Sequence, residues 1–270
     1  MSWKHTASYL GHRIAPRTAL RFEIARRNRH FEKEYWLLPY FCDRGSGAID
    51  VGGNTGLYAF YLSLLACRVH IFEPNPICLG EIARIRRGNM SIHGFALSDR
   101  RGEAVMRFEP GNTGIGTIEP ANRLDQYAGI RKVVQRSVTV CPLDDLELRN
   151  ISFMKIDVEG HEPSVLRGSV RLLENQKPVL LIEIERRHNT SAFQDVESIL
   201  ANFGYSAWRL SGESLIPVRA DEIEELQRLP QASHAEYVNN FIFVPPERLQ
   251  VLQRIGLRSD HRRSARSEPQ

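Results

Sequence analysis

The chain has 270 residues and carries 36 Lys and Arg against 32 Asp and Glu, which gives a net charge of +4. Its 42% hydrophobic and 25% charged residues are ordinary for a soluble globular protein and exclude wholesale disorder. No run approaches the ~18 uninterrupted apolar residues of a membrane span, and the first residues lead into no apolar signal segment. We therefore expect one sizeable cytoplasmic domain with extensions, whose oligomeric state stays open.

Basic residues are concentrated at both ends of the chain. Residues 4–33 hold eight basic and two acidic side chains, and residues 248–270 hold six arginines against Asp260 and Glu268. We predict a helical extension over 1–44, a main domain over 45–247 and a basic tail over 248–270 that is disordered after about Gly256. Such arms can contact nucleic acid or anionic lipid, but a solvated tail is the simpler interpretation.

The four cysteines are widely spaced, and no Cys-x-x-Cys pair occurs: Cys42, Cys67, Cys78 and Cys141. This spacing argues against a disulfide scaffold and against a zinc ribbon. It is typical of reduced thiols in a cytosolic protein, and we expect no redox chemistry from them.

In chain order, the first helical pattern places Leu20, Ile24, Phe31 and Tyr35 near one face, which predicts a helix over one end of the domain. After residues 45–47, short apolar segments alternate with amphipathic ones. We predict strands at 48–51, 68–73, 91–96, 153–157 and 179–184, and helices at 57–65, 76–87 and 162–174. This alternation predicts βαβ units and a parallel sheet.

The alternation breaks between the third and fourth predicted strands. Residues 103–108 and 136–141 have strand patterns and flank a loop, 110–131, that contains Gly and Asn. We predict a β-insertion whose loop is either a substrate lid or a solvated insertion without a role. Residues 203–210 and 238–244 predict two further strands.

The first predicted strand runs into a glycine-rich turn, Asp-Val-Gly-Gly-Asn-Thr-Gly at 50–56. Glycines at such a turn let the backbone approach a ligand closely, and the helix that follows favours negative charge at its start. Glu73 ends the second predicted strand, 17 residues after Gly56, where a carboxylate can accept hydrogen bonds from both ribose hydroxyls. Together these features predict an adenosine-type cofactor.

The choice of cofactor depends on two residues of the turn. The dinucleotide fingerprint needs glycine at position 51, where Val51 stands. The negative charge of Asp50 would repel a pyrophosphate and attract an α-amino group, so S-adenosylmethionine fits better than NAD. An NAD-dependent oxidoreductase on a Rossmann sheet remains an alternative. A second is a protein that binds or modifies nucleic acid through its basic termini, but no aromatic-interleaved basic motif supports it, and no nucleic-acid partner is expected.

Six short blocks occur in one order along the chain: Asp-Val-Gly-Gly-Asn-Thr-Gly-Leu-Tyr (50–58), Phe-Glu-Pro-Asn-Pro (72–76), Ala-Leu-Ser-Asp (96–99), Leu-Asp-Asp-Leu (143–146), Lys-Ile-Asp-Val-Glu-Gly-His-Glu (155–162) and Ile-Glu-Ile (182–184). Over roughly residues 45–210 this series resembles the FkbM family of S-adenosylmethionine-dependent methyltransferases. The resemblance implies an α/β class I methyltransferase (Rossmann-like) fold, with a mostly parallel seven-stranded sheet and helices on both faces. It also implies O-methylation of a carbohydrate or related small metabolite, with no partner beyond this small-molecule or glycan acceptor.

The resemblance also assigns residues to the parts of the cofactor. The methionine end would lie against Asp50, Gly52, Asn54 and Gly56, the ribose against Glu73 and Asn75, and the adenine against Ala96, Leu97 and Ser98. Gly53 stands where the family usually has alanine. The loop 110–131 matches poorly, so the resemblance does not identify the acceptor.

The block 155–162 ends the fourth predicted strand beside the expected methionine end. We predict that Asp157 positions the acceptor or orients the cofactor, and that His161, with an ordinary pKa near ~6.5, is the general base. Alternatively, Asp157 caps the following helix and His161 only hydrogen-bonds its first turn. Glu183 is expected to face Asp157, because adjacent strands lie ~4.8 Å apart. Together with His188 they are divalent-metal ligand types, but no short spacing supports a metal site, and we predict none.

Overall fold

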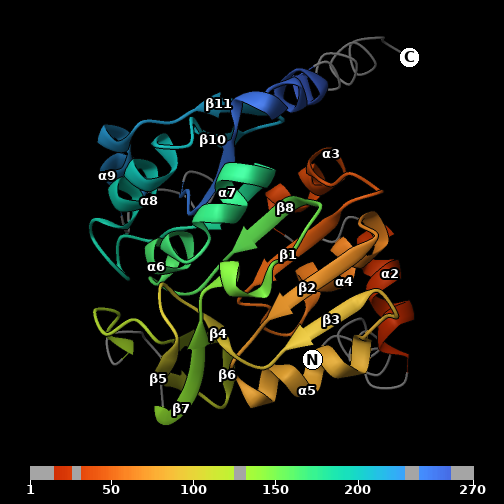
Figure 1. The fold of residues 1–270 in the computed structure, drawn as a ribbon, viewed down its shortest axis with the longest axis vertical. Coiled ribbons are helices and arrows are strands. Elements are labelled where there is room, and N and C mark those ends of the chain that lie inside the picture. The colour runs from red at the N-terminus through yellow and green to blue at the C-terminus, as the bar shows by residue number, and fades with distance from the viewer. Residues whose placement is uncertain (1–14, 26–31, 125–131, 229–236, 257–270) are drawn as a thin grey trace, which may run out of the picture.

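The structure is a computed structural model that describes residues 15–25, 32–124, 132–228 and 237–256. Its core is an eight-stranded mixed sheet with the strand order β11-β10-β12-β9-β8-β1-β2-β3 (Figure 1). The strands are β1 (Gly47–Val51), β2 (Arg68–Phe72), β3 (Met90–His93), β8 (Ile151–Ile156), β9 (Val179–Glu183), β10 (Ser206–Ser211), β11 (Ser214–Pro217) and β12 (Asn240–Val244). Strands β3, β2, β1, β8 and β9 are parallel, and β12 is antiparallel to both β9 and β10. The predicted α/β fold is therefore confirmed, with a mixed central sheet in which five of the eight strands are parallel.

The prediction of seven strands is wrong, because the sheet has eight. The extra strand is β11, which forms a hairpin with β10 in which Ser211 pairs with Ser214. Gly212 adopts a φ of 62° in that turn, a conformation that glycine reaches without steric cost. A four-residue strand at the edge of a sheet gives too short a pattern to be recognised from sequence.

Two predicted elements are divided in the structure. The third predicted strand ends at His93, and Ala96–Leu97 form β4, which pairs with β7 (Val134–Cys141) in a second sheet. The predicted helix 162–174 is two helices, α6 (Glu162–Arg167) and α7 (Val170–Gln176). They separate at Gly168, where an added Cβ would lie 2.0 Å from the Ser98 carbonyl oxygen, so this close backbone contact requires glycine.

The N-terminal extension is made of short pieces rather than one helix. α2 (Pro16–Ala25) is followed, after a gap in the described residues, by a 3-10 turn (Lys33–Leu37) and by α3 (Leu38–Phe41). Phe31 of the predicted helical face lies outside the described residues. Tyr35 is fully buried, and its hydroxyl donates to the Leu57 carbonyl, so this segment packs closely on the domain.

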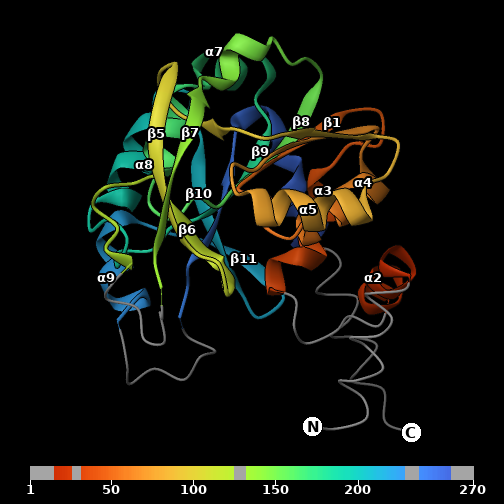
Figure 2. The same ribbon diagram turned by 90° about the horizontal axis from the view of Figure 1, so that it is seen from below.

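Helices cover both faces of the sheet (Figure 2). On one face, α3 and α4 (Leu57–Leu65) share a hydrophobic cluster with the sheet, and α5 (Pro76–Ile85) joins it through Ile82. On the other face, α6, α7 and α8 (Ala192–Ala201) form a second cluster. Residues 250–256 are helical and bury Val251 and Ile255 in the first cluster, so the chain packs on the domain beyond residue 247.

The predicted β-insertion is a four-stranded sheet with the order β4-β7-β5-β6. Its strands β5 (Gly102–Glu109) and β7 confirm the two strand patterns at 103–108 and 136–141. The third, β6 (Asn112–Thr117), lies within the segment predicted as a loop and pairs with β5. The rest of that loop, residues 125–131, and the tail after residue 256 lie outside the described residues.

Candidate active site

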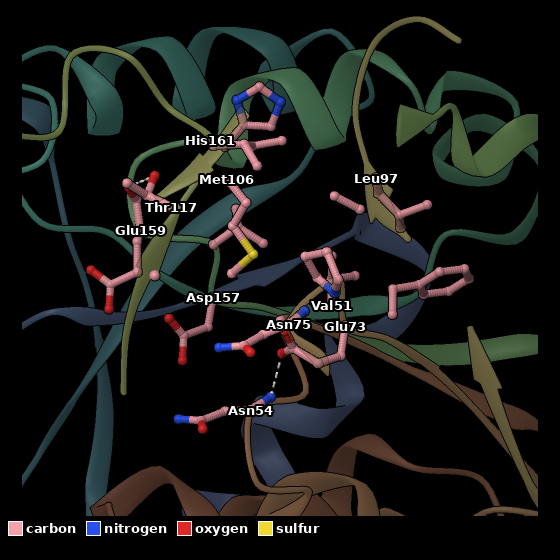
Figure 3. A pocket seen from close by; sticks show the side chains of 17 residues that line it. Val51, Asn54, Glu73, Asn75, Leu97, Met106, Thr117, Asp157, Glu159 and His161 are labelled. Carbon is pink, nitrogen blue, oxygen red and sulfur yellow. Dashed lines mark hydrogen bonds between the residues drawn. The ribbon is translucent and has the colours of Figure 1, made fainter. Parts of the chain in front are cut away.

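A pocket lies where β1, β2 and β8 end, under the β-insertion (Figure 3). Eight of the twelve predicted site residues line it: Gly52, Asn54, Glu73, Asn75, Ala96, Leu97, Asp157 and His161. The other four lie outside its lining: Asp50, Gly56, Ser98 and Glu183.

The glycine-rich turn is shaped by close backbone contacts. Gly52 has a φ of 78°, and an added Cβ would lie 1.8 Å from the Asp157 carbonyl oxygen, so no other residue fits there. Gly53 has an ordinary φ, but an added Cβ would lie 2.5 Å from Cγ2 of Ile71. The neighbouring Ile71 thus accounts for glycine at position 53, where the family usually has alanine.

Glu73 is buried at the end of β2, and its carboxylate is fixed by two backbone donors. Oε2 accepts the Asn54 N–H at 2.7 Å, and Oε1 accepts the Asn75 N–H at 2.8 Å. Burial raises the pKa of Glu73 to about 7, although both of these bonds oppose the rise. A carboxylate has about four acceptor positions, so each oxygen keeps one for a ligand in the pocket.

Asp50 is 1% exposed on β1, just behind the turn. Neither carboxylate oxygen makes a hydrogen bond of good geometry with the described residues. Burial raises the pKa of Asp50 to about 6, although the positive charge of Lys155 opposes the rise. A buried carboxylate without a hydrogen-bond donor is costly, and a cationic group at this end of the pocket would remove much of that cost.

Lys155 is 2% exposed on β8, and it binds Asp157 directly. Its Nζ lies 2.7 Å from Oδ2 of Asp157 and 4.5 Å from the centroid of the Tyr58 ring. Burial lowers the pKa of Lys155, but the surrounding carboxylates outweigh it, Asp157 first, and the net shift is upward. The ammonium group is therefore charged and holds the Asp157 carboxylate in place.

The strand register brings Glu183 beside Asp157. Ile156 of β8 pairs with Ile182 of β9. The residues that follow them, Asp157 and Glu183, therefore lie side by side at the same edge of the sheet. Burial raises the pKa of Glu183 well above its ordinary value, and the charge of Asp157 adds to the rise. Oε1 of Glu183 accepts a hydrogen bond from Nδ2 of Asn239 at 2.8 Å.

His161 lies at the opposite end of the pocket from Asn54, beside Met106 and Thr117 (Figure 3). Both of its ring nitrogens have neighbours: Nε2 is 3.0 Å from the Ser98 hydroxyl, and Nδ1 is 3.1 Å from Oε2 of Glu119. The side chain makes no capping bond to α6. The geometry therefore places His161 with the residues that the family resemblance assigns to adenine.

Several pocket residues were missed from sequence because they come from the β-insertion. Met106 and the segment 116–118 line the pocket from β5 and β6. The insertion is tied to the loop after β8, since Thr117 Oγ1 and Asn122 Nδ2 donate to the Glu159 carbonyl at 2.9 and 2.8 Å. The described part of the predicted loop 110–131 thus lines the pocket through residues 116–118, and its only signal in the sequence was its unusual length.

Glu162 is a second residue that sequence reasoning missed. It is 1% exposed at the start of α6, and Oε1 accepts the Gly160 N–H at 2.9 Å. Burial raises its pKa to about 7. Glu162, rather than Asp157 or His161, therefore holds the backbone of the loop after β8.

The described part of the chain lacks two kinds of feature. No group of three or more His, Cys, Asp or Glu side chains is placed to hold a metal ion. Among the same residues, no helix is long and apolar enough to cross a membrane.

The mixed sheet, with a glycine turn after β1 and an acidic residue at the end of β2, defines a methyltransferase-like α/β fold. A family model described as a methyltransferase FkbM domain matches residues 50–207, more than half of the chain. The protein therefore belongs to the FkbM methyltransferase family.

Relatives of this chain include two proteins named as methyltransferases. The chain is 28% identical over 178 residues to Methyltransferase 1 of Beauveria bassiana, across 57% of this chain and 69% of the relative. It is 24% identical over 193 residues to Methyltransferase sdnD of Sordaria araneosa, across 60% of this chain and 74% of the relative.

Solved structures to which this chain is similar include a methyltransferase FkbM from Methylobacillus flagellatus, with a TM-score of 0.47 and 18% identity. That match covers 74% of this chain and 44% of the solved chain, so this chain spans less than half of its length. An S-adenosylmethionine-dependent O-methyltransferase from Thermotoga maritima has a TM-score of 0.41 and 11% identity, across 84% of this chain and 70% of that chain.

Proposed function

We propose that this protein is an S-adenosylmethionine-dependent O-methyltransferase that acts on a hydroxyl group of a carbohydrate or related small metabolite. The observation that carries the proposal is the Glu73 carboxylate, which the Asn54 and Asn75 N–H groups hold at the end of β2. A carboxylate in this position can accept both hydroxyls of a ribose. Membership of the FkbM family supports methyl transfer as the reaction.

The residues of the pocket fit this cofactor in two further respects. The buried Asp50 carboxylate makes no hydrogen bond of good geometry with the described residues and suits the α-amino group. The close contact of Gly52 with the Asp157 carbonyl fixes the glycine turn against the end of β8, on the wall of the pocket. A pyrophosphate would meet the negative charge of Asp50, which disfavours NAD.

The cofactor, when bound, supplies an electrophilic methyl group. Asp157, held by Lys155, is suited to orient the acceptor hydroxyl, and much of the acceleration can come from such alignment. We assign the removal of the hydroxyl proton to Glu183, which the strand register brings beside Asp157 and whose pKa burial raises well above its ordinary value. This assignment replaces His161, whose two nitrogens are engaged at the other end of the pocket.

The affinity for S-adenosylhomocysteine is expected to fall as the pH is lowered from about 8 to about 5. The reason is that protons compete with the ligand for Glu73 and Asp50, whose pKa values in the free protein are raised to about 7 and about 6. Below both values the affinity should fall by up to ~100-fold per pH unit, since two protons are displaced. Calorimetric titrations across this range measure the effect, and the Glu73→Gln variant should lose the upper part of it. A pH-independent affinity would contradict the proposed roles.

Replacing His161 by alanine is expected to weaken S-adenosylhomocysteine binding by ~10-fold, because Ser98 and Glu119 lose the partner that fixes them at the adenine end. Turnover at saturating cofactor should then stay within ~3-fold of the parent, far from the loss expected for a general base. Calorimetry and steady-state rates measure the two effects. The opposite pattern, unchanged affinity with turnover reduced ~100-fold or more, would return the role of base to His161.

The proposed reaction is tested by incubating the protein with methyl-labelled S-adenosylmethionine and a panel of matched acceptors. Each pair of acceptors presents a hydroxyl or an amino group on the same sugar scaffold. Label is expected on the hydroxyl oxygen, with an O-methyl product identified by mass spectrometry. Label that appears only on nitrogen or carbon would contradict O-methylation while leaving methyl transfer in place.

A further inference from the structure

Three arginine side chains surround a second cavity, far from the pocket described above. Arg17 and Arg21 lie on α2, and Arg87 lies just after α5. The cavity has a volume of about 340 Å³ and is lined by Arg17, Thr18, Arg21, Phe60, Arg87 and Gly88. None of these described residues has an acidic side chain.

The positive charges at this cavity lack compensation within the described part of the chain. The Nη1 atom of Arg87 is buried and has no hydrogen-bond partner among those residues. Burial lowers the pKa of Arg87, and the charges of Arg21 and Arg17 lower it further, so the three groups repel one another. By contrast, Arg84 on α5 pairs with Glu81 at 3.2 Å, which is the ordinary arrangement for a surface arginine.

The fold holds these like charges together despite their repulsion. α2 packs on α4 and α5 through a small cluster of Leu20, Phe60 and Ile85. The Arg17 guanidinium also donates a hydrogen bond to the Arg86 carbonyl, at the end of α5. The cavity is thus a built feature of the contact between helices, at the side of the molecule where α2 lies (Figure 1).

We propose that this cavity binds the phosphate group of a phosphomonoester. A guanidinium group offers a planar set of N–H donors that matches phosphate oxygens, and a dianion compensates several arginine charges at once. The Thr18 hydroxyl adds a neutral donor beside them. A carboxylate ligand would bring only half of that charge.

The site is separate from the active site and does not depend on the proposed function. Asn75 of the active-site pocket caps the start of α5, whereas Arg87 follows its end. A helix of ten residues spans ~15 Å, so a phosphate bound at Arg87 cannot be part of a ligand's reacting end. The ligand is therefore an effector or a tether rather than the cofactor.

The test is calorimetric titration of the full chain with inorganic phosphate in a chloride buffer. We expect one saturable site with millimolar affinity. Arg87→Gln and Arg21→Gln are each expected to weaken it at least ~10-fold, and the control Arg84→Gln, on the same side of the protein, to stay within ~2-fold. Absence of saturable binding, or parent-like affinity in both test variants, would overturn the proposal.

Thermal unfolding without phosphate separates binding from folding. Removing one of three repelling charges should leave the melting temperature of Arg87→Gln at or above that of the parent. If Arg87→Gln has a lower melting temperature than the parent, the test rests on Arg21→Gln. The Arg21 side chain is exposed, so its replacement should not disturb the fold. Phosphate should raise the melting temperature of the parent but not that of the decisive variant. An equal rise in both would contradict the site.

Two further binding experiments identify the kind of molecule that carries the phosphate. Glycerol 3-phosphate stands for a soluble metabolite, and vesicles that contain phosphatidate stand for a lipid. Arg87-dependent binding of the soluble compound alone indicates a metabolite, and Arg87-dependent sedimentation with the vesicles indicates a lipid headgroup. Binding of neither above the chloride background would count against a phosphomonoester site.

Discussion

Replacing Glu73 by alanine is expected to weaken the binding of S-adenosylhomocysteine by at least ~100-fold. The side chain would supply two charged acceptors to the ribose, and each such hydrogen bond contributes about 1.5 kcal/mol or more. Two of them amount to about 3 kcal/mol, which corresponds to ~100-fold in affinity. The variant also frees the Asn54 and Asn75 N–H groups, so the turn itself becomes less well positioned. Calorimetric titration measures the change.

The matched control is Glu81→Ala, on the solvent-exposed side of the next helix, where the carboxylate pairs only with Arg84 among the described residues. Its affinity should equal that of the parent. The melting temperature of Glu73→Ala should stay close to that of the parent, because relief from burying the carboxylate offsets the loss of its two hydrogen bonds. Unchanged affinity in a folded Glu73→Ala protein would overturn the ribose assignment.

Replacing Glu183 by glutamine is expected to lower turnover by ~100- to 10,000-fold, the usual contribution of a general base. Glutamine preserves the size of the side chain and can still accept a hydrogen bond from Asn239, so the fold should not change. Affinity for S-adenosylhomocysteine should stay within ~3-fold, since Glu183 does not line the cofactor pocket. Single-turnover rates and calorimetry measure the two quantities.

The pH profile distinguishes a base from a residue that only supports the structure. In the parent, turnover should rise with pH as Glu183 loses its proton, because its pKa is raised in the folded protein. The Glu183→Gln variant should lack this rise, and the exposed-surface control Glu174→Gln should keep it. A variant that keeps both the parent rate and the parent profile would show that another group takes the proton.

The sequence predicted those parts of the site whose signals are local. The glycine turn, Glu73 and Asn75 each follow a strand with a clear apolar pattern, and their roles need only the order of strands in the sheet. The proximity of Asp157 and Glu183 follows in the same way, because β8 and β9 are parallel neighbours in register. Such inferences need no knowledge of side-chain packing.

The environment of His161 could not be predicted, because its partners Ser98 and Glu119 come from segments more than 40 residues away. The same holds for Met106 and Thr117, which reach the pocket only because the β-insertion folds over it. The break at Gly168 depends on a single backbone contact with Ser98. These features arise from tertiary packing, which overrides the local pattern.

The most direct test of the cofactor assignment is calorimetric titration of the purified protein with S-adenosylhomocysteine and, in parallel, with NADH. The buried Asp50 carboxylate and the ribose acceptor Glu73 predict saturable, micromolar-range binding of S-adenosylhomocysteine and no binding of NADH. Binding of NADH alone would contradict the account and identify the protein as an oxidoreductase. Absence of binding by both would contradict the assignment of this pocket to a nucleoside cofactor.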